Sequence, residues 1–319
     1  MKILANDGLD QSGIDALTAK GFEVITTKVS QDALVSYINE HQIRTVLVRS
    51  ATQIRKELID VCPSLEIIGR GGVGMDNIDV DYARSKDIHV INTPAASSAS
   101  VAELVFSHLF SGARFLEDSN RRMPVVGDTE FAVLKKNYAK GIELRGKTIG
   151  IVGMGRIGQE VAKIALGLGM RVVAADSNVG KATIKVTFYN NQFINVDIET
   201  QPLEDVISIS DFITFHVPAQ KDGYLVGKPE FDKMKDGVAV VNCSRGGVID
   251  ELALIEALDS GKVSFAGLDV FENEPTPRKE ILTHSKISLT PHTGASTVEA
   301  QDRIGLSLAE QICSILQIQ

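Results

Sequence analysis

Residues 148–176 read TIGIVGMGRIGQEVAKIALGLGMRVVAAD, and this stretch decides the fold. An apolar run, 148–152, leads into the glycines Gly153, Gly155 and Gly158, which are followed by a helix-length segment and a second apolar run. A strand, a glycine turn that opens a helix and a second strand are typical of a dinucleotide-binding unit. The glycines let the backbone approach a pyrophosphate, and the positive N-terminus of the helix attracts it.

Asp176 ends the second strand of this unit, about 20 residues after the glycines. A carboxylate at this position accepts a hydrogen bond from a ribose hydroxyl of the adenosine half of the cofactor. Residues 177–180 contain no Arg or Lys that could pair with an additional phosphate. The sequence therefore predicts NAD, rather than NADP, as the cofactor.

A second set of glycines, Gly69, Gly71 and Gly74, has the same spacing but a different context. The strand that follows it ends in Asn92 and Thr93 and supplies no acid. Exposed backbone N–H groups at the end of a strand can bind a carboxylate instead. A carboxylate site and a simple tight turn both remain open for this segment.

The alternation of strand and helix continues outward from residues 148–176 in both directions. The apolar runs are short and continuous, as in strands that helices cover on both faces of a parallel sheet. We therefore predict an α/β fold with two doubly wound parallel sheets. The expected strands are 2–6, 23–26, 45–48, 66–68, 89–92, 148–152, 171–175, 212–216, 238–242, 265–270 and 286–289, and the expected helices include 12–20, 32–40, 53–61, 80–86, 101–115, 157–168 and 296–316.

Two segments depart from a simple α/β alternation. The polar residues 117–147 show little periodicity and predict a surface arm after the helix 101–115. Residues 182–198 alternate like a β-hairpin, which could be a structural elaboration, a contact with the adenine end of the cofactor or a contact with another subunit. The last helix is expected to bury a stripe of Val298, Ile304, Leu308 and Ile312.

Composition excludes several classes of function. A length of 319 residues favours two domains, and a net charge of −8 without any Trp opposes nucleic-acid binding. The three cysteines Cys62, Cys243 and Cys313 are too few and too widely spaced to predict a metal site or a disulfide framework. No apolar run is long enough for a membrane span, and no signal-peptide pattern opens the chain. We expect a cytoplasmic protein with no metal, nucleic-acid or membrane partner.

Three polar residues follow strands of the half that carries the glycine turn. Arg245 follows 238–242, Glu274 lies beyond 265–270, and His292 follows 286–289. Ligands of open α/β sheets bind at the carboxyl ends of the strands, so the three side chains are expected on one rim. An arginine can bind a carboxylate bidentately, and a histidine oriented by a carboxylate can transfer a proton. Together with a nicotinamide they predict hydride transfer at a 2-hydroxy acid.

The other histidines are weaker candidates. His216 ends a strand before Val217 and Pro218 and is expected to line the cofactor cleft. For the remaining four we expect structural or surface roles: His41, His89, His108 and His284.

Long motifs along nearly the whole chain resemble the D-isomer-specific 2-hydroxyacid dehydrogenase family, most of all its phosphoglycerate dehydrogenase branch. These motifs are VRSAT at 48–52, GRGGVGMDNID at 69–79, the glycine turn at 153–158, NCSRGGVIDE at 242–251, GLDVFENEP at 267–275 and TPHTGAST at 290–297.

The resemblance implies a discontinuous arrangement of the chain. Residues 1–98 and 295–319 would form a flavodoxin-like substrate domain, and 99–294 would form an inserted Rossmann domain with a crossing helix and a dimerisation arm. A homodimer would be built through that helix and arm. Because the chain stops at Gln319, the C-terminal regulatory domains of longer relatives are not expected.

The resemblance also assigns residues to roles. It implies that Arg245, Glu274 and His292 are catalytic and that Arg49, Gly72 and Val73 bind substrate, with Arg49 near the distal phosphate. The expected cofactor contacts are Val73, Gly153, Gly155, Arg156, Ile157, Gly158, Asp176, His216, Val217, Pro218, Cys243, Ser244, Asp269, Gly294 and Ala295.

The arm lacks the Gly-Lys-Trp stretch that is usual in the family, and its lysines Lys135, Lys136 and Lys140 stand in unfamiliar surroundings. The phosphate-binding residues are therefore open. We expect conversion of 3-phosphoglycerate to 3-phosphohydroxypyruvate in serine biosynthesis, with hydroxypyruvate, glyoxylate or another 2-keto acid as the alternative substrate. A non-catalytic, NAD-sensing protein like the corepressors of this fold is the alternative from another class.

Overall fold

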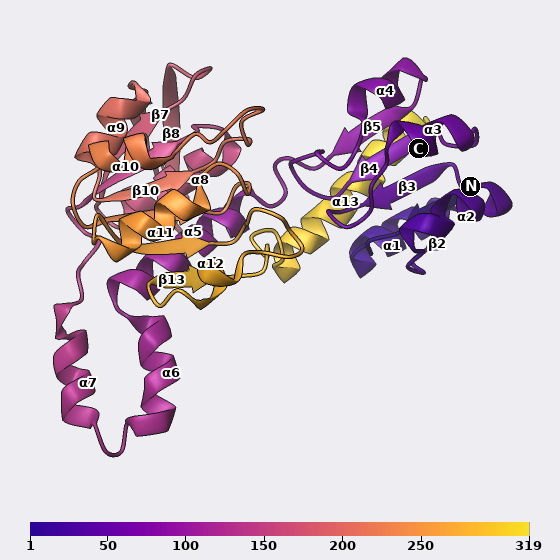
Figure 1. Cartoon of the computed structure of the whole chain (residues 1–319). Coiled ribbons are helices and arrows are strands. Elements are labelled where there is room, and N and C mark those ends of the chain that lie inside the picture. Colours follow the sequence, from indigo (N-terminus) through magenta and orange to yellow (C-terminus); the bar gives the residue numbers. More distant parts are fainter. Residues whose placement is uncertain (319) are drawn as a thin grey trace. The chain divides into compact units, whose positions relative to one another are not determined.

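The computed structural model describes residues 1–318 and divides the chain into two compact units (Figure 1). Unit 1 comprises Met1–Ser98 and the C-terminal segment from Ala295, and unit 2 comprises Ala99–Gly294. Each unit has its own parallel sheet, so the α/β class predicted from the alternating pattern is confirmed.

Unit 1 contains a five-stranded parallel sheet in the order β2-β1-β3-β4-β5, the flavodoxin-like order. Successive residues of β1 enter opposite cores: Ile3 packs with α1 and α13, and Leu4 packs with α2, α3 and α4. The elements are β1 (Lys2–Ala5), α1 (Gln11–Ala19), β2 (Glu23–Ile25), η1 (Gln31–Ala33), α2 (Leu34–His41), β3 (Thr45–Val48), α3 (Lys56–Val61), β4 (Ile67–Arg70), α4 (Val80–Ser85), β5 (His89–Asn92) and α13 (Val298–Ile315).

The last helix packs very closely on the first. A Cβ on Gly13 of α1 would lie 2.7 Å from the Cα of Gly305 on α13, so the two helices meet through their glycines. Ile304, Leu308 and Ile312 are buried as expected. The expectation for Val298 is wrong: its side chain is 81% exposed, because it is the first residue of the helix and precedes the first buried position, Ala300.

Unit 2 contains a six-stranded parallel sheet in the order β13-β12-β11-β10-β6-β7. One face packs against α5, α8 and the β8–β9 hairpin, and the other against α9, α10, α11 and α12. The elements are α5 (Ser98–Ala113), β6 (Thr148–Val152), α8 (Arg156–Gly167), β7 (Arg171–Ala175), β8 (Lys181–Thr187), β9 (Phe193–Glu199), α9 (Leu203–Ile209), β10 (Phe212–Phe215), α10 (Lys228–Lys233), β11 (Val238–Asn242), α11 (Glu251–Asp259), β12 (Val263–Leu268), α12 (Lys279–Thr283) and β13 (Ile287–Leu289).

The predicted hairpin is confirmed as the antiparallel pair β8–β9. Its inner face buries Ala182, Ile184 and Ile198 in the core that contains α8. After β9 the chain makes a single parallel bridge, Thr200 to Ala174 of β7, beside the edge strand. A doubly wound unit usually connects the strand β7 to the next parallel strand through a helix, and here the hairpin stands in place of that helix.

The arm predicted for residues 117–147 is largely helical. It contains α6 (Leu116–Val126), α7 (Phe131–Asn137) and the 3-10 turn η2 (Tyr138–Lys140). The helix pair extends away from the sheet of unit 2 (Figure 1). It leaves apolar side chains in solvent, with Val125 76%, Phe131 59% and Val133 52% exposed.

Candidate active site

The glycine turn of unit 2, residues 153–158, allows a ligand to approach its backbone closely. Gly153 has φ +101°, where side chains are strained, and a Cβ on Gly158 would lie 2.0 Å from the Gly153 oxygen. A Cβ on Gly155 would meet open space. Helix α8 begins at Arg156, directly after Gly155, and no side chain caps its N-terminus. A pyrophosphate fits this turn, since backbone N–H groups and open space meet at the start of a 12-residue helix.

Asp176 lies beside the same turn. One carboxylate oxygen accepts from the Met154 N–H at 2.7 Å, and the other accepts from Asn178 at 2.7 Å and Val179 at 2.9 Å. Burial opposes ionisation of the carboxyl, but these N–H bonds outweigh it and lower the pKa of Asp176. The residue therefore presents a carboxylate at neutral pH, as an acceptor for a ribose hydroxyl requires.

A hollow of about 550 Å³ opens between the glycine turn and Asp176. Six residues predicted to bind cofactor line it: Gly153, Gly155, Asp176, His216, Val217 and Pro218. Asn178, Gln201, Leu203 and Gln220 also line the hollow, and no motif in the sequence marked them. They come from the segments on either side of the hairpin and from the loop after His216, which only the folded chain brings together.

His216 is neutral in this setting. Its Nε2 lies 3.0 Å from the Thr214 hydroxyl, its Nδ1 is buried without a partner, and burial lowers the pKa of the ring to about 3. The neutral ring of His216 lines the hollow without adding a charge to it.

His292 and Glu274 are joined by a short hydrogen bond. The histidine follows β13, the glutamate follows β12, and Nδ1 of His292 lies 2.7 Å from Oε2 of Glu274. Glu274 also accepts from the Phe271 N–H at 2.9 Å. Burial opposes ionisation of Glu274, but His292, the Phe271 N–H and the charge of Arg245 outweigh it, and the pKa of the carboxyl is lowered. With Nδ1 held by Glu274, Nε2 of His292 is the nitrogen available to a substrate.

Arg245 is presented by a loop that Asn242 holds. The Asn242 amide donates to the Arg245 carbonyl at 2.9 Å, and its oxygen accepts from the Ser244 N–H at 3.0 Å and the Ser244 hydroxyl at 2.7 Å. A Cβ on Gly246 would lie 2.0 Å from the Phe271 oxygen, so this loop lies against the segment that leads to Glu274. Arg245, Glu274 and His292 are thus grouped in unit 2, at the rim predicted from the strand ends.

The turn after His292 is bound to Asp269, which is 1% exposed. Asp269 accepts from the N–H groups of Thr293 at 2.7 Å and Gly294 at 2.8 Å. Cys243 is buried too, and burial, with the charge of Asp269, raises the pKa of its thiol.

Three further predicted cofactor contacts lie elsewhere in the chain. Arg156 and Ile157 stand at the start of α8, and Ala295 is the first residue of the C-terminal segment of unit 1.

The predicted substrate residues of unit 1 lie at the carboxyl ends of neighbouring strands. Arg49 follows β3, and Gly72 and Val73 follow β4. Gly72 has φ +141°, a backbone conformation that residues with a side chain rarely adopt, so glycine is favoured at this position. Val73 is 38% exposed.

The backbone at Arg49 is held from two sides. The Asp7 carboxylate accepts from the Arg49 N–H at 2.7 Å, and the Asn77 amide donates to the Arg49 carbonyl at 2.9 Å. Asp7 also accepts from the Thr52 N–H and hydroxyl and from Lys28. No motif in the sequence marked Asp7 as part of this site.

Comparison with known proteins identifies the family. The sequence model of the D-isomer specific 2-hydroxyacid dehydrogenase NAD-binding domain matches residues 106–294. The chain belongs to the D-isomer-specific 2-hydroxyacid dehydrogenases. The family resemblance and the NAD cofactor predicted from the sequence are confirmed, and unit 2 carries the NAD-binding domain.

Relatives of this family differ in the activity they are named for. Hydroxypyruvate reductase of Thermotoga maritima is 40% identical, over 99% of both chains. D-3-phosphoglycerate dehydrogenase of Archaeoglobus fulgidus is 38% identical over 99% of this chain, which spans only 57% of that relative's length. Among solved structures, the holo form of D-mandelate dehydrogenase from Rhodotorula graminis has a TM-score of 0.84 at 26% identity, covering 98% of this chain and 93% of that one. The dehydrogenase class is therefore established for the family, and the substrate is not.

Two further properties concern residues 1–318. No helix in that range is long and apolar enough to cross a membrane. Within the same range, no three His, Cys, Asp or Glu side chains gather in a way that could hold a metal ion.

Proposed function

We propose that this dehydrogenase interconverts 3-phosphoglycerate and 3-phosphohydroxypyruvate, a reaction that supplies serine biosynthesis, with Arg245, Glu274 and His292 as its catalytic residues. The observation that carries the reaction type is the 2.7 Å hydrogen bond between His292 and Glu274, beside Arg245. This arrangement provides a proton acceptor, a group that orients it and a cation for the substrate carboxylate.

The mechanism follows from these three side chains. NAD, when bound, supplies the hydride acceptor at C2 of the substrate. Arg245 binds the substrate carboxylate. In unit 1, Gly72 and Val73 are the proposed substrate-binding part of the backbone. His292 takes the hydroxyl proton on Nε2, and Glu274 stabilises the imidazolium that forms. In the direction of reduction, the imidazolium returns this proton to the carbonyl oxygen.

Arg49 is the proposed ligand of the substrate phosphate. Its guanidinium can bind a phosphate bidentately, and Asp7 and Asn77 fix the backbone from which it extends. The names of several relatives, including that from Archaeoglobus fulgidus, support the phosphorylated substrate.

Reduction of hydroxypyruvate is the second candidate. The Thermotoga maritima relative named for that reaction matches this chain over 99% of both lengths, whereas the chain spans just over half of the phosphoglycerate dehydrogenases. The arm also lacks the Gly-Lys-Trp stretch common in the family.

The deciding experiment follows NADH consumption with 3-phosphohydroxypyruvate, hydroxypyruvate and glyoxylate in parallel. We expect the highest kcat/KM with the phosphorylated keto acid. Arg49→Ala should lower this value at least about tenfold, as the loss of a charge-assisted pair predicts, and should change the value for hydroxypyruvate much less. Arg44→Ala, which removes a surface arginine paired with Glu66, is the matched control.

Equal rates with all three keto acids would replace the phosphoglycerate assignment by hydroxypyruvate or glyoxylate reduction. Absence of turnover with each of them, together with tight NADH binding, would favour the NAD-sensing alternative.

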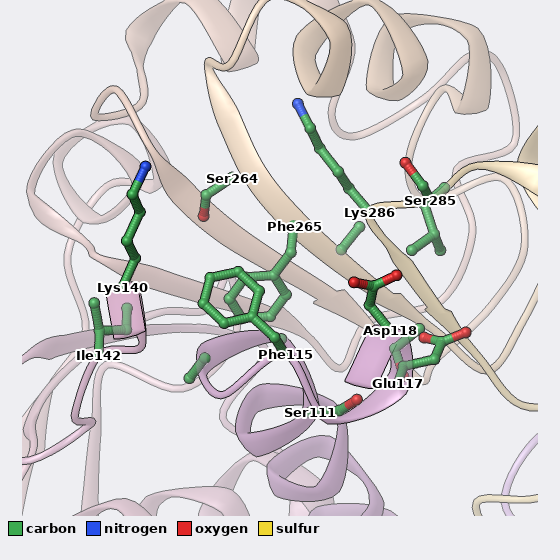
Figure 2. A pocket seen from close by; sticks show the side chains of 15 residues that line it. Ser111, Phe115, Glu117, Asp118, Lys140, Ile142, Ser264, Phe265, Ser285 and Lys286 are labelled. Atoms are coloured by element: carbon green, nitrogen blue, oxygen red, sulfur yellow. The ribbon is translucent and has the colours of Figure 1, made fainter. Parts of the chain in front are cut away.

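We also propose a homodimer built through α5 and the arm. A hollow of about 210 Å³ lies where the end of α5 and the start of the arm meet β12 and β13. Figure 2 shows the rings of Phe115 and Phe265 in the middle of its lining, with Lys140 on one side and Asp118 on the other. This apolar hollow and the exposed Phe131 and Val133 of the arm form a surface suited to a second copy.

We also propose a cytoplasmic location. The three cysteines are free thiols, which suits the reducing cytoplasm.

A further inference from the structure

His108 lies inside unit 2 with both ring nitrogens bonded. It belongs to α5 and is 2% exposed. Its Nδ1 lies 2.8 Å from the Ser288 hydroxyl, and its Nε2 lies 3.1 Å from the Thr290 hydroxyl. A Cβ on Gly267 of β12 would come within 2.5 Å of the His108 Cβ, so α5 lies directly on the strand.

The hydrogen bonds assign the protons of this cluster. The Thr290 hydroxyl lies 2.6 Å from Oδ1 of Asp269, which also accepts from the Thr293 N–H. A carboxylate can only accept, so Thr290 gives its single proton to Asp269. The bond between Thr290 and His108 must then be donated by Nε2–H of the ring, and Nδ1 accepts from Ser288.

The protonation state of the ring agrees with this assignment. Burial lowers the pKa of His108, against a smaller opposing effect of the Asp269 charge. The ring is therefore neutral at physiological pH, with its one proton on Nε2.

The hydrogen-bonded chain His108–Thr290–Asp269, called the relay below, ends at the turn that follows His292. Asp269 holds the N–H groups of Thr293 and Gly294, the two residues that follow His292. His292 has φ +55°, a left-handed conformation that a non-glycine residue adopts only when its surroundings hold it there. The orientation of the Asp269 carboxylate therefore contributes to the placement of His292.

We propose that His108 is a positioning residue for His292, acting through Thr290 and Asp269. The inference rests on the proposed role of His292 in proton transfer. It gives a function in the reaction to a buried residue of α5 outside the proposed catalytic three.

Two substitutions of similar size separate the two bonds of the ring. In His108→Gln the longer amide reaches the position of Nε2 and can donate to Thr290. In His108→Asn the shorter amide reaches the position of Nδ1 and can contact only Ser288. Ser288→Ala removes the bond outside the relay and is the matched control.

Steady-state kinetics with NADH and the preferred keto acid test the proposal. We expect His108→Asn to lower kcat about 5- to 10-fold, as loss of a buried hydrogen bond predicts, whereas His108→Gln and Ser288→Ala stay within about twofold of the wild type. The dissociation constant of NADH, measured by fluorescence, should stay within about twofold in all three, because the glycine turn is untouched. Equal kcat in the Asn and Gln variants, whether reduced or unchanged, would overturn the proposal. If His108→Asn does not fold, His108→Phe serves as the variant without a donor.

A spectroscopic readout is independent of turnover. Compared with the wild type, His108→Gln should lack the signals of one neutral Nε2–H ring in a long-range ¹H–¹⁵N spectrum of the histidine side chains, while those of other neutral rings such as His216 remain. A neutral Nδ1–H ring or a charged ring at this position would rule out the relay.

His292→Ala is measured alongside to separate the two levels of inference. If this variant retains turnover, the proposed catalytic role of His292 fails. If it is inactive while the His108 variants are indistinguishable from each other, only the positioning role fails.

Discussion

The imidazole of His292 and the carboxylate of Glu274 form a hydrogen bond of 2.7 Å although the two residues stand at the ends of different strands. Both side chains are about one-third exposed, at 36% and 34%, so a substrate can reach the pair. The carboxylate also accepts a hydrogen bond from the Phe271 N–H, which suits the role we propose for it, that of orienting the histidine that exchanges a proton with substrate.

This pair predicts a pH dependence of stability. The folded-state pKa of Glu274 is below its ordinary value, so folding favours the ionised form. The contribution to the free energy of unfolding is therefore present above the unfolded pKa of about 4.3 and is lost as the pH falls through the folded pKa. We expect Glu274→Gln to be less stable than the wild type at pH 7, by at most about 1 kcal/mol because both side chains are partly exposed.

Urea unfolding of the two proteins between pH 7 and pH 3 measures this difference. The two stabilities should converge as the pH falls below about 4.3. Glu143→Gln, a change at an exposed glutamate, is the control and should follow the wild type throughout. A difference that grows on acidification would contradict the prediction.

Asp176 predicts the choice between the two nicotinamide cofactors. Asp176→Asn keeps an oxygen that can accept from the turn but removes the charge that attracts the ribose hydroxyl and repels a phosphate there. We expect the dissociation constant of NADH to rise about tenfold or more and that of NADPH to stay unchanged or fall. Fluorescence titration with both cofactors measures this, with Arg44→Ala in unit 1 as the control. Equal losses of affinity for NADH and NADPH would contradict the proposed hydrogen bond between Asp176 and the ribose.

Much of the fold could be predicted because its signals are local. The continuous apolar runs, the glycine turn and the alternation at 182–198 each lie within a few residues of one another, and the structure has the corresponding strands, turn and hairpin. Catalytic candidates followed from the same information, because parallel strands end on one rim of a sheet.

Contacts between distant segments could not be predicted. Asp7 binds the backbone of Arg49 across 42 residues, and His108 reaches Thr290 across 182. The arm at residues 117–147 was predicted but its helices were not, since α6 and α7 pack with each other along only part of their surface and can remain polar elsewhere. Val298 was misassigned because helical periodicity carries no information on where a helix first meets its partner.

The hairpin predicts a stability effect without an effect on the cofactor. Ile184 is 1% exposed and belongs to the core that contains α8, so Ile184→Ala should lower the free energy of unfolding by about 2–4 kcal/mol. Thr187→Ala on the exposed face should change it by less than about 0.5 kcal/mol. Tyr189→Ser at the fully exposed tip separates the other two interpretations. A weakened NADH affinity in that variant would indicate an adenine contact, and a changed sedimentation coefficient would indicate a subunit contact.

Substitution of Asp7 is expected to change the preference for the phosphorylated substrate through Arg49. The Asp7 carboxylate accepts hydrogen bonds from the N–H groups of Arg49 and Thr52 at 2.7 and 3.1 Å. Burial opposes ionisation of the carboxyl, but Lys28 and these hydrogen bonds outweigh it, so the pKa of Asp7 is lowered and the group stays ionised. Asp7→Ala removes all of these bonds and frees the loop from which Arg49 extends. We expect KM for 3-phosphohydroxypyruvate to rise about tenfold with little change in kcat, since binding of the phosphate is lost and the proton transfer at His292 is not. Asp7→Asn keeps an oxygen for the two N–H groups and should restore most of the affinity. If Asp7→Ala lowered kcat for hydroxypyruvate and the phosphorylated substrate alike, Asp7 would support unit 1 as a whole rather than the arginine.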